Sequence, residues 1–156
     1  MDIKQVKQEY KSGSLSKVDF INKMHEFHKV LFDFSNSLAG TEIGKIEITD
    51  GSVVFTSRAT DFHPGGAKFY VDIADKRITP VDTFNFDMYE QEDSEMLYKL
   101  VSDNDTIFDI GANIGWYSNH LSKKLPGATI YSFEPIPETF AQVKKNTELN
   151  GAKNIN

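Results

Sequence analysis

The sequence predicts an α/β fold with a parallel sheet in the last third of the chain. Two short apolar runs rich in β-forming residues, Thr106–Ile110 and Thr129–Phe133, alternate with helix-compatible segments at 114–124 and 137–149. Strand, helix, strand and helix in this order call for parallel strands joined by right-handed crossovers. With a further helix expected over 92–101, residues 89–156 predict the start of an open parallel sheet.

Residues 1–40 predict a helical segment. Ser16 lies three residues before Asp19 and ahead of an apolar-periodic run, which is typical of a helix N-cap, and Gly13 separates this helix from a shorter one upstream. The aromatic stripe of Phe20, Phe27 and Phe34 predicts a helix–helix seam, against the sheet region or against another protein, rather than a ligand site. The apolar positions recur at spacings of three and four residues: Phe20, Met24, Phe27, Leu31 and Phe34.

Residues 41–88 predict a small antiparallel β region. Asp50 and Gly51 stand between two β-branched runs, which is a strong short-range signal for a hairpin. A second turn around Asp75 and Lys76 predicts another hairpin within residues 68–86.

The stretch TIFDIGANIGWYS, residues 106–118, predicts a ligand-binding loop between strand and helix. Gly111 and Gly115 allow a sharp turn and a close approach of a ligand, and Asn113 tolerates a left-handed backbone. The nicotinamide fingerprint G-x-G-x-x-G is absent, and Asp109 closes the strand instead. A carboxylate at this place favours a ligand that carries a cation over one that carries a pyrophosphate.

The next strand ends in Glu134, directly before Pro135. A carboxylate at the carboxyl end of a parallel strand can accept hydrogen bonds from both hydroxyls of a ribose. S-adenosylmethionine is a nucleoside derivative that carries a cation and no phosphate, so it fits both features. We expect its ribose on Glu134, its adenine near Pro135 and Ile136, and its methionine part over the glycine loop with the ammonium toward Asp109.

TIFDIGANIGWYS followed by IYSFEPIPETFAQVKKNTELNGAKNI resembles the cofactor-binding motifs of the FkbM family of class I S-adenosylmethionine-dependent methyltransferases. The resemblance implies a Rossmann-like fold and methylation of a hydroxyl group. It also implies cofactor contacts at Asp109, Gly111, Asn113, Gly115 and Glu134. Tyr89 and Glu90 are further candidates, because such enzymes often close over the cofactor at this place.

The upstream segments resemble those that precede such domains in modular polyketide synthases. This resemblance implies a small-molecule or carrier-bound acceptor, such as a polyketide hydroxyl, and other polyketide synthase domains as partners. The family's sheet has more strands than this chain supplies, because a third strand only begins at residues 154–156. We therefore expect this chain to be a fragment that is inactive by itself, and we name no catalytic base.

Composition excludes several other classes. A net charge of −6 argues against nucleic-acid binding, and the absence of cysteine excludes thiolate metal sites and fits a reducing compartment. His25 and His28 lack a third ligand nearby, so no metal site is expected, and His63 in DFHPGG is expected to serve its turn. No run has the length of a membrane span and the N-terminus lacks the apolar core of a signal peptide, so we expect a cytoplasmic protein.

Two alternatives stay open at this point. A fragment of a nicotinamide-dependent oxidoreductase would share the strand, loop and helix, although Asp109 argues against it. A noncatalytic interaction module would account for the helical segment and the missing strands.

Overall fold

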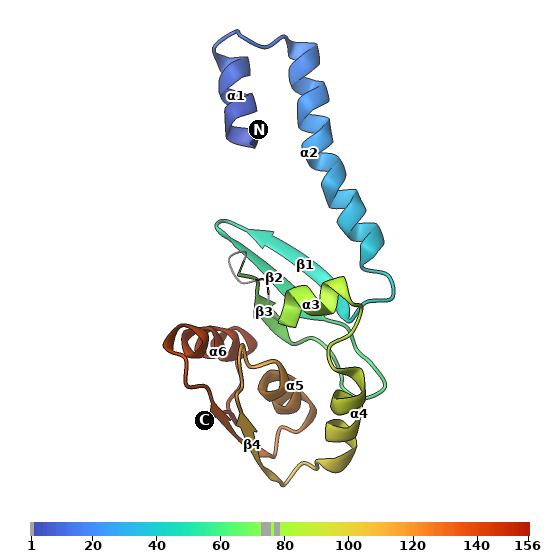
Figure 1. Cartoon of the computed structure of the whole chain (residues 1–156), viewed down its shortest axis with the longest axis vertical. Helices are drawn as coiled ribbons and strands as arrows, with labels where there is room; N and C mark the ends of the chain where they lie inside the picture. The colour runs from blue at the N-terminus through green and yellow to red at the C-terminus, as the bar shows by residue number, and fades with distance from the viewer. Residues whose placement is uncertain (1, 73–75, 77–78) are drawn as a thin grey trace. The chain divides into compact units, whose positions relative to one another are not determined.

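The computed structural model describes residues 2–72, 76 and 79–156 of the chain (Figure 1). It divides into two compact units, residues 1–39 and 40–156. In the described residues, no helix combines the length with the apolar character that crossing a membrane requires.

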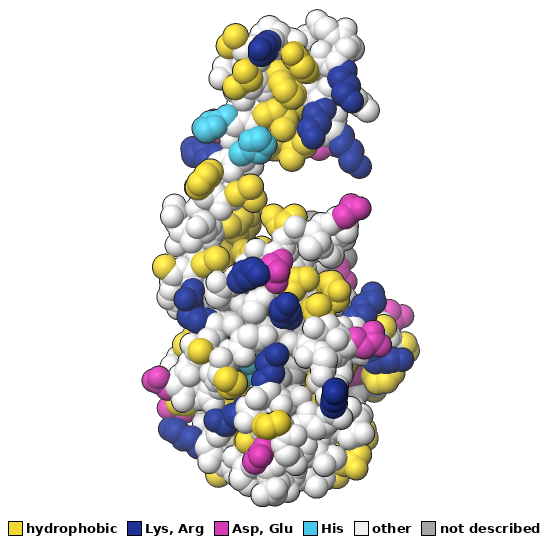
Figure 2. Space-filling model, turned by 180° about the vertical axis from the view of Figure 1, so that it is seen from behind, with side chains coloured by type: hydrophobic (Ala, Val, Ile, Leu, Met, Phe, Trp, Pro, Cys, Tyr) yellow, Lys and Arg dark blue, Asp and Glu magenta, His cyan; other side chains and the backbone are white. Residues whose placement is uncertain are grey.

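The first unit consists of helix α1, Ile3–Lys11, and helix α2, Lys17–Ser37. The predicted N-cap is confirmed, since the Ser16 hydroxyl accepts a hydrogen bond from the Asp19 amide at 3.1 Å. The rings of Tyr10 and Phe20 stack with centroids 4.3 Å apart and join α1 to α2. A seam between the aromatic stripe and the sheet region or another protein stays a prediction. Helix α2 has no buried residue, and apolar side chains are exposed along the helical unit (Figure 2). Val18 and Phe32 are among the exposed side chains of α2.

The second unit starts with an antiparallel sheet in the order β1-β2-β3, made of Ile43–Thr49, Ser52–Ser57 and Lys68–Tyr70. The predicted hairpin at Asp50 and Gly51 is confirmed. The second predicted hairpin is wrong, because the chain after β3 forms helix α3, Thr79–Asn85, instead of a strand. Pro80 has no amide hydrogen for a strand ladder and fits the first turn of a helix. Asp75, at the expected turn, lies outside the described residues.

The predicted parallel sheet is confirmed. After helix α4, Gln91–Leu100, the chain forms β4, Thr106–Ile110, then α5, Trp116–Lys124, then β5, Thr129–Phe133, and finally α6, Pro137–Asn150. Strands β4 and β5 pair in parallel from Thr106↔Thr129 to Ile110↔Phe133. Ile155 forms a parallel bridge with Ile130, so a third strand starts beside β5 as expected. The fold is therefore α/β, with a Rossmann-like β-α-β-α unit at its C-terminal end.

Side chains alternate between the two faces of this sheet, and the faces differ in burial. On one face the core contains Tyr98 of α4, two leucines in and just after α5, and Ala128 and Ile130 at β5. On the other face four apolar side chains are exposed and partly stack on one another: Phe108, Ile110, Tyr131 and Phe133.

Two asparagines of α6 bind the edge of β3, in the place where a neighbouring strand would pair. Asn146 accepts from the Tyr70 amide at 3.0 Å, and its own amide donates to the Ile114 carbonyl at 2.9 Å. Asn150 accepts from the Lys68 amide and donates to the Lys68 carbonyl, both at 2.8 Å. Because Ile114 belongs to the glycine loop, the buried Asn146 side chain connects the antiparallel sheet to that loop.

Replacement of Asn146 by leucine should destabilise the second unit. The Asn146→Leu change keeps the volume but leaves the Tyr70 amide and the Ile114 carbonyl without this partner, at a cost of about 2–4 kcal/mol. Urea unfolding measures the difference. Ala141→Leu, at an exposed position of the same helix, is the control and should change the free energy of unfolding little; equal stabilities of the two variants would contradict the role of Asn146.

Candidate functional site

The glycine loop follows β4 and turns the chain into α5. Gly111, Asn113 and Gly115 have φ angles of 82°, 52° and 79°. The left-handed backbone predicted for Asn113 is confirmed, and this conformation is one that glycine and asparagine adopt at low cost. Three left-handed residues within five positions let the loop lie at the carboxyl end of β4, where α/β sheets bind their ligands.

The two glycines have different surroundings. A Cβ atom on Gly111 would meet no heavy atom within 4 Å, so this side of the loop faces open space. A Cβ atom on Gly115 would lie 2.9 Å from the Asn119 side-chain nitrogen and 3.5 Å from Val143 of α6. Gly111 thus leaves room for a ligand, whereas Gly115 allows α5 and α6 to pack behind the loop.

The amides at the start of the loop are engaged inside the chain. Those of Gly111 and Ala112 both donate to the Phe133 carbonyl at 2.9 Å, and that of Asn113 donates to Glu134 Oε2 at 2.9 Å. A pyrophosphate would require such amides to point at the ligand. The arrangement therefore disfavours the dinucleotide alternative.

Glu134 joins the carboxyl ends of β4 and β5. Its Oε2 atom accepts from Asn113, and its Oε1 atom accepts from the Ile136 amide at 3.0 Å. A carboxylate oxygen has two lone pairs, so each oxygen can accept one more hydrogen bond. The half-buried Glu134 can still bind two hydroxyl groups, with the exposed Pro135 beside it. Sequence reasoning placed Glu134 at the strand end but missed its bonds to the loop and to Ile136.

Asp109, in β4, precedes the loop and is hydrogen-bonded to α5. Its Oδ2 atom accepts from the Ser118 hydroxyl at 2.5 Å, and Ser118 is also 2.5 Å from the Ser132 hydroxyl of β5. Burial raises the pKa of the Asp109 carboxyl, and the bond from Ser118 partly opposes this rise. Asp109 therefore also ties β4 to α5. The role of the serines was missed, because nothing local in the sequence links either of them to Asp109.

Tyr89 and Glu90 lie just before α4, beside the first turn of α5. The Tyr117 hydroxyl donates to Glu90 at 2.7 Å, and burial raises the pKa of this hydroxyl. The Tyr89 ring centroid is 6.0 Å from those of both Trp116 and Tyr117. Trp116 itself is buried and stacks on Phe69 at 4.8 Å, so it packs in the core.

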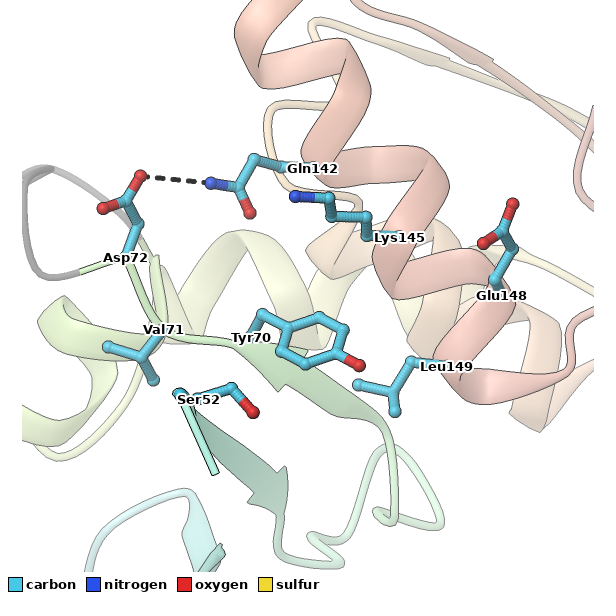
Figure 3. Close-up of a pocket in the computed structure, with 9 residues that line it drawn as sticks. Ser52, Tyr70, Val71, Asp72, Gln142, Lys145, Glu148 and Leu149 are labelled. Carbon is cyan, nitrogen blue, oxygen red and sulfur yellow. Dashed lines mark hydrogen bonds between the residues drawn. The ribbon is translucent and has the colours of Figure 1, made fainter. Parts of the chain in front are cut away.

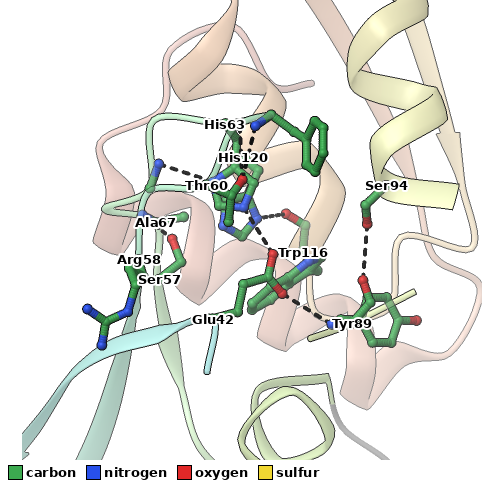
Figure 4. Close-up of polar contacts among 12 residues, drawn as sticks. Glu42, Ser57, Arg58, Thr60, His63, Ala67, Tyr89, Ser94, Trp116 and His120 are labelled. Atoms are coloured by element: carbon green, nitrogen blue, oxygen red, sulfur yellow. Dashed lines mark hydrogen bonds and ion pairs between the residues drawn. The ribbon is translucent and has the colours of Figure 1, made fainter. Parts of the chain in front are cut away.

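Glu42, His63 and His120 form a buried polar cluster (Figure 4). His63 serves its turn as predicted, accepting from the Gly65 amide at 3.1 Å, but its other ring nitrogen lies 3.1 Å from Glu42 Oε1, a contact the sequence did not predict. His120 donates to the Trp116 carbonyl at 2.8 Å, and its ring centroid is 4.3 Å from that of His63. Burial lowers the pKa of His120 to about 3.

No metal centre is found in the part of the chain that the structure describes. His25 and His28 are exposed on α2. A groove of about 600 Å³ lies between β3 and α6, with the Gln142 amide donating to Asp72 at 3.2 Å (Figure 3). None of the predicted site residues lines this groove, so it is separate from the candidate site.

No family model matches the chain. Three curated proteins are similar to parts of it. Methyltransferase 1 of Beauveria bassiana is 38% identical over 53 residues, which are 34% of this chain and 21% of the relative. The 31-O-demethyl-FK506 methyltransferase FkbM of Streptomyces tacrolimicus is 43% identical over 42 residues, 27% of this chain and 16% of the relative. The hexuronic acid methyltransferase AglP of Haloferax volcanii is 32% identical over 59 residues, 38% of this chain and 23% of the relative.

The matched segments thus span between 16% and 23% of these relatives, all methyltransferases by name. Among solved structures, M. jannaschii TYW2 in complex with AdoMet aligns with a TM-score of 0.48 at 18% identity, over 66% of this chain and 41% of that one.

The pH dependence of stability should reveal the buried His120. In the unfolded chain its imidazole titrates near the ordinary value of 6.5, whereas in the folded chain the pKa is about 3. The unfolded state therefore binds one more proton between these values. The free energy of unfolding should fall with decreasing pH in this window, by up to about 1.4 kcal/mol per pH unit from this group.

Urea unfolding from pH 7 to pH 4 tests this expectation. His120→Leu should flatten the profile in that range, and His25→Leu, at an exposed position on α2, should leave its slope as in the unmodified chain. A His120→Leu profile with the original slope would contradict a neutral buried imidazole.

Proposed function

We propose that this chain forms the S-adenosylmethionine-binding part of a methyltransferase. The observation that carries the proposal is the Glu134 carboxylate, which joins the ends of β4 and β5 and keeps one lone pair free on each oxygen. It lies next to the loop at Gly111, where a Cβ atom would find only open space. A carboxylate beside an open glycine loop, at the carboxyl edge of a parallel sheet, suits a nucleoside.

The charges around the loop favour a cationic ligand. Asp109, Glu134 and Glu90 contribute three carboxylates, and none of them forms an ion pair within the described residues. A ligand with a positive charge would gain from this field, and a pyrophosphate would be repelled by it. The charges and the engaged loop amides together favour S-adenosylmethionine over a nicotinamide dinucleotide.

In this arrangement Glu134 binds the ribose hydroxyls, with the adenine near Pro135 and Ile136. The methionine part would lie over Gly111, with its ammonium toward Asp109, directly or through water. Tyr89 and Glu90 border the site from the start of α4. S-adenosylmethionine, when bound, supplies a methyl group that is already activated by the sulfonium charge. The residues of this chain would bind and orient it, and its alignment with the acceptor is what such a transfer mainly needs.

The acceptor in the proposed reaction is a hydroxyl oxygen of a small molecule, free or carrier-bound. The names of two relatives, which act on 31-O-demethyl-FK506 and on hexuronic acid, support small-molecule acceptors of more than one kind. A polyketide hydroxyl with polyketide synthase domains as partners, in the cytoplasm, is the specific form of the proposal. The catalytic base is not assigned to a residue of this chain.

Loss of the Glu134 carboxylate should weaken cofactor binding. Glu134→Ala removes the acceptor for the ribose hydroxyls, and calorimetry should show a loss of about 1.5–3 kcal/mol in the free energy of S-adenosylmethionine binding. Glu138→Ala removes an exposed carboxylate from the first turn of α6 and should bind as the unmodified chain does. Equal affinities of the two variants for S-adenosylmethionine would contradict the assignment of Glu134 to the ribose hydroxyls.

A side chain at Gly111 should block the site. Gly111→Val places a branched group in the space over the loop, so S-adenosylmethionine binding should fall below detection. Gly51→Val is a matched control, because Gly51 has a similar φ angle of 77° and a Cβ atom there would also meet no heavy atom within 4 Å, but it lies in the β1–β2 turn. If both variants bind with the original affinity, the loop at Gly111 is only a turn.

A further inference from the structure

The segment 87–90, which leads into α4, has an unusual backbone. Asp87 and Glu90 have φ angles of 70° and 42°, in the left-handed region that non-glycine residues rarely adopt. Such conformations cost free energy and persist only where surrounding contacts hold them, and they gather at functional sites. The contacts that hold this segment come from two sides.

On the first side, Glu42 binds the segment with its backbone and its side chain. Its amide donates to the Asp87 carbonyl at 2.7 Å, and its Oε2 atom accepts from the Tyr89 amide at 3.1 Å (Figure 4). Glu42 is only 5% exposed. A carboxylate so deeply buried is costly unless hydrogen bonds compensate for its lost hydration.

His63 provides the second of these hydrogen bonds. Its Nδ1 atom accepts from the Gly65 amide at 3.1 Å, so the proton of the neutral ring is on Nε2, which donates to Glu42 Oε1 at 3.1 Å. Both carboxylate oxygens of Glu42 therefore face donors. Glutamine could not replace it without loss, because it has one acceptor oxygen and would turn its own donor toward the ring or the Tyr89 amide.

On the other side, the segment contacts the helix that follows the glycine loop. Tyr117, the second residue of α5, donates to Glu90 at 2.7 Å. Ser94, in α4 itself, donates to the Tyr89 carbonyl at 3.1 Å. The Tyr89 ring lies beside that of Tyr117, at 6.0 Å between centroids. The segment is thus held between the buried Glu42 and the first turn of α5.

We propose that Glu42 is a positioning residue for the cofactor site: through the Tyr89 amide it holds segment 87–90 beside the glycine loop and thereby sets the cofactor affinity. The inference rests on the proposed function for the identity of the cofactor. It assigns to His63 the task of orienting the Glu42 carboxylate. Neither residue needs to touch the ligand.

The test is Glu42→Gln with two measurements on the whole chain. Hydrogen exchange without cofactor should be about tenfold faster at the amides of segment 87–90, and the affinity for S-adenosylmethionine by calorimetry should be about five- to tenfold lower, equivalent to one hydrogen bond. Ser57→Ala is the control. It removes a buried acceptor for the Ala67 amide at 3.0 Å in the same sheet, and it should lower stability while leaving exchange at 87–90 and the affinity unchanged.

The two measurements separate the two proposals. An unmodified chain that does not bind S-adenosylmethionine would contradict the proposed function, and the exchange data would still decide whether Glu42 holds the segment. A folded Glu42→Gln variant with the original exchange and affinity would overturn the inference. If Glu42→Gln does not fold, Tyr117→Phe breaks the bond to Glu90 without changing the buried cluster; an affinity about two- to fivefold lower would support the role of the segment, and an unchanged affinity would overturn it.

Discussion

The candidate site depends on the two hydrogen bonds that Glu134 accepts from the backbone. Together with the bonds from the Gly111 and Ala112 amides to the Phe133 carbonyl, they join the glycine loop after β4 to the turn after β5. The carboxylate accepts from Asn113 in one and from Ile136 in the other, at 2.9 Å and 3.0 Å. Hydrogen bonds to an ionised acceptor are stronger than those between neutral groups. One side chain thus fixes the geometry of both loops and remains able to bind a ligand.

Further polar groups connect the elements around the site to one another. Asp109 and Ser118 tie β4 to α5, Asn146 ties the loop to β3, and Glu42, directly before β1, binds the segment before α4. All of these groups are at least half-buried, and each makes hydrogen bonds that offset its lost hydration. Since the bonds are directional, they fix positions more narrowly than apolar packing does. The antiparallel sheet is therefore part of the structure that shapes the site, although it contributes no predicted ligand contact.

The local features of the C-terminal region could be predicted from the sequence because they depend on neighbouring residues. Strands β4 and β5 follow from short β-rich runs with clear ends, and their observed limits are the predicted ones. The left-handed Asn113 follows from the few residue types that tolerate this backbone. The hairpin at Asp50 and Gly51 follows in the same way. The prediction of a strand after β3 was wrong. It followed the β-rich pattern, whereas Pro80 favours the first turn of a helix, and a helix forms there.

The sequence by itself determined the order of the elements, the parallel sheet and the positions of Glu134 and the glycine loop, because periodicity and turn chemistry act over a few residues. Only the tertiary structure decided which distant residues of the chain contact one another. Glu42 and His63 are 21 residues apart, and Asn146 and Tyr70 are 76 apart. No local pattern encodes such pairs, because they form only when packing buries two polar groups together and each must find a partner there.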